Sequence, residues 1–462
     1  MSETIADILA AHRSGRRSPA QTIAQAYARI RAHGDDAVFI SLREEADAVA
    51  EAERLAPVHA DRPLFGVPVA VKDNIDVAGL PTTAACPAFA YRPAHDATAV
   101  ARLRAAGAIP IGKTNLDQFA TGLVGVRTPY GIPRNPFNPA VIPGGSSAGS
   151  AVAVATGLVP LALGTDTAGS GRVPAGLNNV VGLKPSLGLV STHGVVPACR
   201  TLDCVSVFAL TVDDAYLTLG VIAGFDAADP FSRAGSVAPL GTMPRGLRVG
   251  VPAEGQRIFF GDRAAAAAYA AALARLARLG VNLVETDMEP FYEAARLLYD
   301  GPWIAERYLT ARALIASAPD SLHPVTRDII LAGERPSAAD AFAAFYKLAE
   351  LRRVRDHVFA TIDALALPTV PTVYTVAQVL LDPIALNSRL GTYTNFVNLL
   401  ELCAIAVPAA MRPDGLPFGV TLMAQAGRDA LIAAIGRAFH ADTGLPFGAA
   451  AKLTPQPARR SC

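Results

Sequence analysis

The chain has 462 residues, and its 41 basic and 40 acidic side chains leave a net charge of +1. Half of the residues are apolar (51%) and 18% are charged, a balance that excludes a disordered chain and favours a sizeable hydrophobic core. No run of like charge interrupts this balance. We therefore expect neither a nucleic-acid partner nor binding to an anionic membrane.

In chain order, the first predicted element is a helix after Ser18-Pro19 that ends at Gly34, since serine caps, proline suits the first turn and glycine suits the end. Alternating valines then predict a strand that ends near Lys72. The later expected elements are helices at 97–107, 147–157 and 262–280, strands at 108–115, 158–165 and 281–286, and a loose surface connection at 226–247. This alternation of strands and helices favours an α/β fold around a mostly buried sheet.

The cysteines and the apolar runs indicate the compartment. The five cysteines are scattered and none has Cys-x-x-Cys spacing, so we expect no disulfide framework and a reducing environment. The first 18 residues lack the apolar core of a secretory signal, and apolar runs are broken before they reach 18 residues. These features predict a cytoplasmic protein with no membrane span.

The stretch 141–186 is rich in glycine and serine, and two common interpretations fit it poorly. A phosphate-binding loop requires Gly-Lys-Ser/Thr, but Ala-Val follows the Gly-Ser cluster. Residues 145–149 match Gly-x-Ser-x-Gly, which would make Ser147 the nucleophile of a strand–turn–helix elbow. However, three prolines precede this segment, and none of the eight histidines has a context typical of catalysis.

Several ordered blocks give a third interpretation. These blocks are GVPVAVKDNIDVAGLPTT, KTNLDQFATG, PGGSSAGSAVAVATG, GTDTAGSGRVPAG and GLKPS, followed by weaker matches at 394–409 and 415–429. With them the sequence resembles the amidase signature family over residues 55–445. The resemblance implies a mixed β-sheet core with helices on both faces. It also implies an N-terminal helical segment (1–55), an amidase signature domain (56–450) and a C-terminal tail (451–462), without the further C-terminal domain of related enzymes.

The resemblance implies a Ser–Ser–Lys triad, in which Ser170 is the nucleophile, Ser146 the bridging serine and Lys72 the base. A serine hydroxyl needs an adjacent base, and a lysine is a base only when its amine is neutral. Burial favours the neutral amine, and the valine-rich strand before Lys72 supplies an apolar setting. Singly, such a lysine is usually solvated and such a serine usually caps a helix. The ordered blocks together favour the triad.

The loop around Ser170 carries further expected roles. Backbone N–H groups at a tight turn can bind the oxyanion of a tetrahedral intermediate. The family's oxyanion hole falls on Thr167, Ala168, Gly169 and Ser170 of this chain. We expect Asp166 and Arg172 to hold this loop by charge and hydrogen bonding, the alternative being a plain surface ion pair. We interpret Lys113 and Lys184, which lie near the same blocks, as structural.

At two places the sequence departs from the commoner family pattern, and there it resembles the allophanate hydrolase group. Gly171 follows the nucleophile where many members have isoleucine, and residues 297–308 (LLYDGPWIAERY) are similar to that group. An arginine fork suits the carboxylate of allophanate, so we expect Tyr299 and Arg307 to bind it. Asp300 and Pro302 predict a helix start that places Arg307 about two turns into the helix. Backbone groups of Gly122 are expected to contact the substrate amide.

The expected reaction releases ammonia from the terminal amide of allophanate and forms N-carboxycarbamate, which then loses carbon dioxide. We expect no metal and no cofactor, a homodimer, and a functional link to urea carboxylase. Two alternatives stay open, namely another amidase acting on malonamide-type or broad aliphatic and aryl amides, and the amidase subunit of a tRNA-dependent amidotransferase. A scaffold with a dead site would have lost a triad member, whereas Lys72, Ser146 and Ser170 are all present.

Overall fold

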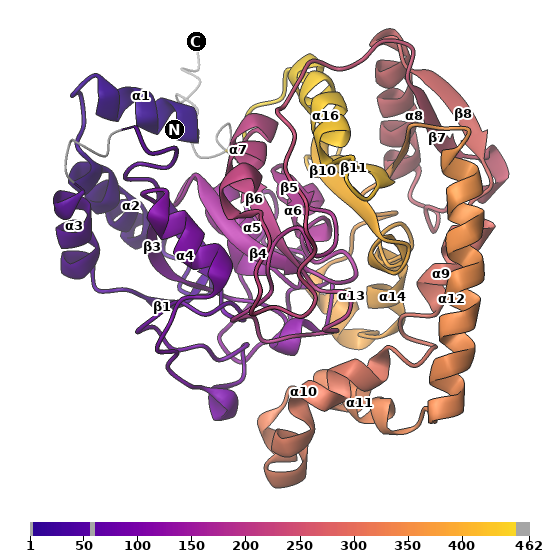
Figure 1. Ribbon diagram of the computed structural model, residues 1–462, viewed down its shortest axis with the longest axis horizontal. Helices are drawn as coiled ribbons and strands as arrows, with labels where there is room; N and C mark the ends of the chain where they lie inside the picture. The colour runs from indigo at the N-terminus through magenta and orange to yellow at the C-terminus, as the bar shows by residue number, and fades with distance from the viewer. Residues whose placement is uncertain (1–2, 56–60, 450–462) are drawn as a thin grey trace, which may run out of the picture.

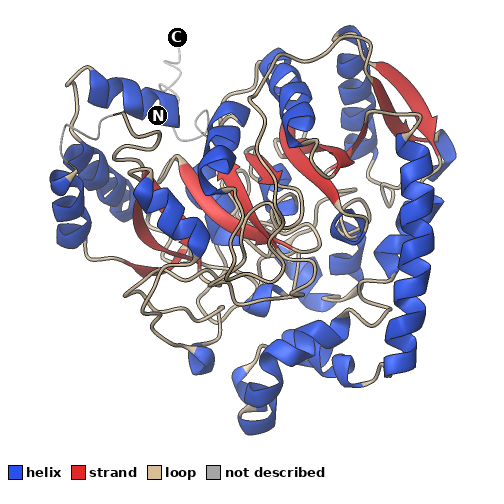
Figure 2. Cartoon of the chain, viewed as in Figure 1, coloured by secondary structure: helices blue, strands red, loops and turns tan. Residues whose placement is uncertain are grey.

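An eleven-stranded mixed sheet crosses the molecule (Figures 1 and 2) in the computed structural model, which describes residues 3–55 and 61–449. The strand order is β1-β3-β2-β4-β6-β5-β10-β11-β9-β7-β8. The strands are β1 Phe39–Leu42, β2 Pro68–Lys72, β3 Ile109–Thr114, β4 Leu161–Asp166, β5 Val181–Lys184, β6 Cys204–Ala209, β7 Arg248–Pro252, β8 Asn282–Thr286, β9 Ala364–Pro368, β10 Leu402–Met411 and β11 Pro417–Gln425.

Helices cover both faces of this sheet, as the resemblance implied. One face is covered by α4 (Thr98–Ala105), α7 (Val212–Ile222), α8 (Arg263–Arg278) and α16 (Asp429–Thr443). The other is covered by α2 (Pro19–His33), α3 (Glu45–Arg54), α5 (Ala148–Ala155), α6 (Val173–Leu177) and α15 (Phe396–Leu399). Every residue of the central strands β2, β4, β5 and β6 is buried, because helices pack on both sides of them.

A helical extension lies beside the sheet, along the right side and the bottom of Figure 1. It comprises α9 (Glu289–Arg296), α10 (Ile304–Ser317), α11 (Pro324–Leu331) and α12 (Ala338–Phe359). The remaining helices are α1 (Ile5–Arg13), α13 (Val376–Leu381) and α14 (Ala385–Leu390). This extension carries Tyr299 and Arg307, so residues from two parts of the molecule can meet at one site.

The pairing of strands explains where the site forms. β2 runs parallel to both β3 and β4, with Val71 opposite Lys113 on one side and Leu163 on the other. The carboxyl ends of the three strands therefore meet at one edge of the sheet. Lys72 ends β2, and Asp166 ends β4.

Most of the elements predicted in chain order are confirmed. Ser18 caps α2 through Gln21 N–H, with Pro19 first in the helix and Gly34 left-handed at its end. The sequence did not indicate β1, which lies antiparallel to β3, so the first 55 residues contribute an edge strand as well as helices. In the described part of the chain the four cysteines are buried and free, whereas Cys462 lies outside it. No helix among the described residues is long and apolar enough to cross a membrane.

Candidate active site

Lys72 is a fully buried amine that lies between two hydroxyl groups. Its Nζ donates to Ser146 Oγ at 2.7 Å and to Thr165 Oγ1 at 2.7 Å. Thr165 comes from β4, the parallel neighbour of β2, and Ser146 comes from the turn before α5. Two of the three predicted triad residues are therefore in direct contact, and Thr165 is a partner that the sequence did not single out.

Burial lowers the pKa of Lys72 from its usual value to about 7. The carboxylates of Asp117, Asp203 and Asp166 oppose this change, and the guanidinium of Arg307 reinforces it. Within the described chain no carboxylate bonds directly to Nζ. A large fraction of this lysine is therefore neutral near pH 7, as a general base requires.

Ser170 lies in the turn between β4 and α6, and its side chain is almost completely buried. Its hydroxyl donates to the carbonyl oxygen of Gly122 at 3.5 Å, a long contact. Among residues 3–55 and 61–449 no hydrogen bond joins the Ser146 and Ser170 hydroxyls. The predicted contact between these two hydroxyls is therefore not formed in this structure, as is common for catalytic hydrogen bonds before substrate binds.

The backbone N–H groups of residues 167–170 differ in whether they already have a hydrogen-bond acceptor. Those of Thr167, Ala168 and Ser170 have no acceptor within the described part of the chain. The N–H of Gly169, by contrast, donates to Asp166 Oδ1 at 2.8 Å, so in this structure it is not available to a substrate oxygen. Of the four predicted oxyanion donors, three are unengaged.

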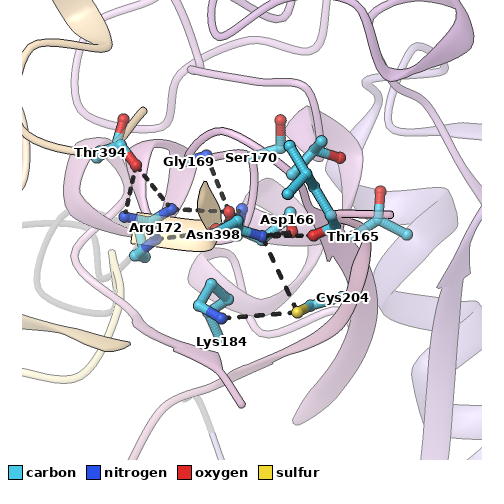
Figure 3. Close-up of polar contacts among 12 residues, drawn as sticks. Thr165, Asp166, Gly169, Ser170, Arg172, Lys184, Cys204, Thr394 and Asn398 are labelled. Carbon is cyan, nitrogen blue, oxygen red and sulfur yellow. Dashed lines mark hydrogen bonds and ion pairs between the residues drawn. The ribbon is translucent and has the colours of Figure 1, made fainter. Parts of the chain in front are cut away.

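Asp166 and Arg172 form a buried bidentate ion pair that fixes this turn (Figure 3). Arg172 Nε and one terminal nitrogen each donate to Asp166 at 2.8 Å, and both side chains are inaccessible to solvent. Asp166 also accepts from the N–H groups of Gly169 and Gly171. Burial would raise the pKa of Asp166, but Arg172, together with Lys184 and the Gly171 N–H, more than offsets this and lowers the pKa. The alternative of a plain surface ion pair is wrong.

Two glycines of the Gly-Ser clusters are required by close approach. A Cβ at Gly145 would lie 2.1 Å from Asp117 Oδ2, and one at Gly169 would lie 2.4 Å from Thr394 Oγ1. Gly169 also has φ of +136°, a conformation that side chains rarely adopt. The peptide bond between Gly145 and Ser146 is cis.

Arg307 is buried and lies next to the turn that faces Ser170. One terminal nitrogen donates to Thr121 Oγ1 at 3.1 Å and to Ala120 O at 3.4 Å, and the other donates to Tyr299 Oη at 3.4 Å. Its guanidinium also lies 5.3 Å from the centre of the Tyr299 ring. Because Thr121 precedes Gly122, the arginine and the nucleophile contact neighbouring residues of one turn.

The predicted start of the helix that carries Arg307 is wrong. Helix α10 begins at Ile304, which makes Arg307 its fourth residue, and its N-cap position is Trp303. Asp300 does not cap it, since no side-chain hydrogen bond caps α10, and the Asp300 N–H donates to Arg296 O in the turn that follows α9. The arginine nevertheless lies on the side of the helix that faces the site.

A cavity of about 320 Å³ is lined by Tyr299 together with Asp300, Tyr292, Gly391 and Asn395. Asn395 follows Thr394, whose carbonyl accepts from Arg172 and whose buried hydroxyl has no partner in the described chain. Neither residue was identified from the sequence, although both lie in the weakly matching block 394–409.

No group of three or more metal-binding side chains occurs among the described residues.

The predicted structural lysines both have buried partners. Lys113 Nζ lies 3.0 Å from Asp73 Oδ1, and Lys184 Nζ donates to Pro185 O at 2.7 Å and to Cys204 Sγ at 3.6 Å (Figure 3). Neither lysine bonds to Ser146 or Ser170.

Comparison with known proteins gives consistent matches. A family model described as Amidase matches residues 21–432. The urea amidolyase of Saccharomyces cerevisiae is 49% identical over 382 residues, which cover 82% of this chain but 21% of that protein. The chain thus spans about a fifth of the length of the urea amidolyases it matches.

Two further comparisons cover more of the related proteins. One subunit of the glutamyl-tRNA(Gln) amidotransferase of Chloroflexus aggregans is 36% identical, over 87% of this chain and 88% of that protein. The solved structure of Kluyveromyces lactis allophanate hydrolase superimposes with a TM-score of 0.92 at 42% identity, over 97% of this chain and 74% of that one.

Proposed function

The chain belongs to the amidase family, and we propose that it is an allophanate hydrolase that cleaves the terminal amide of its substrate with a Ser–Ser–Lys triad. The observation that carries this proposal is the position of the buried guanidinium of Arg307, which donates a hydrogen bond to the Thr121 hydroxyl. The next residue, Gly122, accepts a hydrogen bond from Ser170 through its carbonyl oxygen. A cation that contacts the residue next to the nucleophile's partner suits a small amide that carries its own carboxylate. Similarity to urea amidolyases and to the Kluyveromyces lactis allophanate hydrolase supports the same substrate.

Proton transfer starts at Lys72. Its neutral amine accepts the proton of Ser146, which in turn accepts the proton of Ser170 as Ser170 Oγ attacks the amide carbonyl. The unengaged N–H groups of Thr167, Ala168 and Ser170 bind the oxygen that becomes negative. Ser146 then returns the proton to the leaving nitrogen, so that ammonia departs and an acyl-enzyme remains.

Water then hydrolyses the acyl-enzyme, and Ser146 and Lys72 again transfer the protons. It loses a proton to the Ser146–Lys72 pair and attacks the acyl carbon, and the Ser170 oxygen leaves with a proton. The direct product is N-carboxycarbamate, a labile dianion that loses carbon dioxide. Arg307 and the Tyr299 hydroxyl bind the carboxylate throughout, so one amide carbonyl stays aligned with Ser170.

The test is release of ammonia from allophanate, biuret and malonamide by the wild-type chain, Ser170→Ala, Arg307→Ala and Arg307→Lys. We expect activity on allophanate alone, its loss in Ser170→Ala, and a rise in KM of about 100-fold in Arg307→Ala. Arg307→Lys keeps the charge and removes the fork, so it should recover only part of the affinity. Equal activity on the uncharged amides that survives Arg307→Ala would leave an amidase with another substrate.

Further proposals concern the context of the enzyme. The chain acts in a reducing, cytoplasmic compartment as a homodimer, and it consumes the product of a urea-carboxylating activity. Residues 1–55 pack on the amidase domain of 56–450, whereas the predicted tail, 451–462, lies outside the residues that the structure describes. Size-exclusion chromatography with light scattering tests the dimer. Assays of ammonia release from urea with and without an added urea carboxylase test the functional link.

A further inference from the structure

Asp203 is a buried carboxylate that bonds to the turn carrying the three unengaged N–H groups. It immediately precedes β6, the antiparallel neighbour of β4. Its Oδ1 accepts from the hydroxyl of Thr167 and from the N–H of Cys199, and its Oδ2 accepts from the N–H of Ala198. Three neutral donors satisfy this carboxylate, and no cation forms a hydrogen bond with it within the described chain.

The bond to Thr167 constrains its backbone as well as its side chain. A threonine has few accessible χ1 rotamers, so a fixed hydroxyl also fixes the orientation of the Cα and of the N–H next to it. Thr167 is the first residue after β4, and its N–H has no acceptor among the described residues. The strand on one side and Asp203 on the other therefore hold this N–H in one direction.

The loop that ends at Asp203 also contacts the helix that carries Arg307. Glu306 Oε2 accepts from Thr201 Oγ1 at 2.9 Å and from Thr201 N–H at 3.3 Å. The Cys199 thiol lies 3.6 Å from the Trp303 carbonyl oxygen. The loop 198–203 thus connects the beginning of α10 to the turn before Ser170.

We propose that Asp203 is a positioning residue that holds the Thr167 N–H toward the reacting carbonyl and ties this N–H, through loop 198–203, to the helix that carries Arg307. This inference rests on the proposed function, because it gives the Thr167 N–H the task of binding the oxyanion. Asp203 itself does not touch the substrate. Its effect belongs to the chemical step, since the oxyanion exists only in the transition state and the intermediate.

The chain offers a closely matched control in Asp229. Asp229 and Asp203 are both 6% exposed and line one cavity of about 190 Å³. Asp229 also accepts from two backbone N–H groups and one threonine hydroxyl, namely Thr192 N–H, Phe231 N–H and Thr192 Oγ1. None of these partners belongs to the turn before Ser170, so a purely structural effect should be similar at both positions.

The experiment compares Asp203→Asn, Thr167→Val, their double variant and Asp229→Asn by steady-state kinetics and thermal unfolding. We expect kcat to fall about 10- to 100-fold in Asp203→Asn and in Thr167→Val with KM little changed, because loss of one oriented donor has effects of this order. The double variant should be no slower than the slower single variant, because both changes act through one N–H. Asp229→Asn should keep its kcat. Additive losses, or equal losses in Asp203→Asn and Asp229→Asn, would overturn the proposal.

A second measurement separates this inference from the identity of the substrate. Phenylmethanesulfonyl fluoride modifies an activated serine, because the Ser170 oxygen bonds to sulfur while fluoride leaves and the hydroxyl proton passes to the base. We expect Asp203→Asn to slow this modification, followed by mass spectrometry, about 10-fold relative to Asp229→Asn. Slowed modification without hydrolysis of allophanate would reject the proposed substrate and retain the role of Asp203. Equal modification rates would reject that role.

Discussion

The carboxyl ends of β2 and β3 lie side by side, and each has a fully buried lysine. Lys113, on β3, lies 3.0 Å from the carboxylate of Asp73 and also donates to Thr82. Lys72, at the end of β2, has only the hydroxyls of Ser146 and Thr165 as hydrogen-bond partners of its amine in the described chain. Burial lowers the pKa of both amines, but a carboxylate in direct contact opposes this at Lys113. The two buried amines therefore differ in the partner that each contacts, which is a carboxylate at Lys113 and a pair of hydroxyls at Lys72.

Replacing Lys72 should reduce the catalytic rate far more than replacing Lys113, and this is the largest effect that we expect. Lys72→Met keeps the length and the apolar stem but removes the amine, so we expect kcat to fall at least about 1,000-fold. The fold should tolerate the change, since an apolar side chain replaces a buried amine without leaving a carboxylate unpaired. Ammonia release and thermal unfolding measure the two effects. Ser147→Ala, which removes a neighbouring buried hydroxyl, is the control, and a Lys72→Met enzyme as active as this control would contradict the assignment.

On the neighbouring strand, replacing Lys113 by methionine should lower the stability and leave the activity unchanged. Lys113→Met leaves the Asp73 carboxylate buried without its cation, and loss of one partner of a buried pair costs about 3–5 kcal/mol of unfolding free energy. The activity per folded molecule should stay near the wild-type value. Urea denaturation together with an active-site titration separates the two quantities. Adding Asp73→Asn should recover part of the stability, and a stable but inactive Lys113→Met would refute the structural role.

Giving Lys72 a carboxylate partner should change its titration. The unsubstituted enzyme should show an acid limb of kcat/KM near pH 7, because only the neutral amine accepts a proton and its pKa is about 7. In Thr165→Asp the new carboxylate stabilises the ammonium form, so the acid limb should move up by about 1 to 2 pH units. Thr165→Asn is the neutral control of similar size. An acid limb that stays in place in Thr165→Asp would show that another group controls it.

The sequence predicted the catalytic blocks well because their signals are local. A strand of alternating valines that ends at Lys72, and Gly-Ser turns before short helices, are patterns within a few residues. The buried ion pair of Asp166 and Arg172 was also within reach, since the two residues are six positions apart and flank the nucleophile. The start of α10 was misplaced because Asp300 resembles a cap, whereas its N–H completes the preceding turn.

Contacts between distant parts of the chain could not be predicted in the same way. Thr165 was placed in a strand, but only the parallel register of β2 and β4 brings its hydroxyl to Lys72. Asp203 lies 36 positions from Thr167, and nothing in its surrounding sequence indicates their bond. The hydrogen bond from the Gly169 N–H to Asp166 could not be predicted either, because it depends on the rotation of one peptide group in the turn.

The central position of β10 has a consequence for synthesis. The triad residues lie within the first 170 positions, but β5 has its second partner only when β10 (Leu402–Met411) emerges from the ribosome. Asn398, which donates to the carbonyl oxygen of Asp166, emerges equally late. Until then the nascent chain has an unpaired strand edge beside an unfinished catalytic turn, a state prone to aggregation. Slow translation of residues 187–401 would therefore lower the yield of active enzyme while leaving every catalytic residue intact.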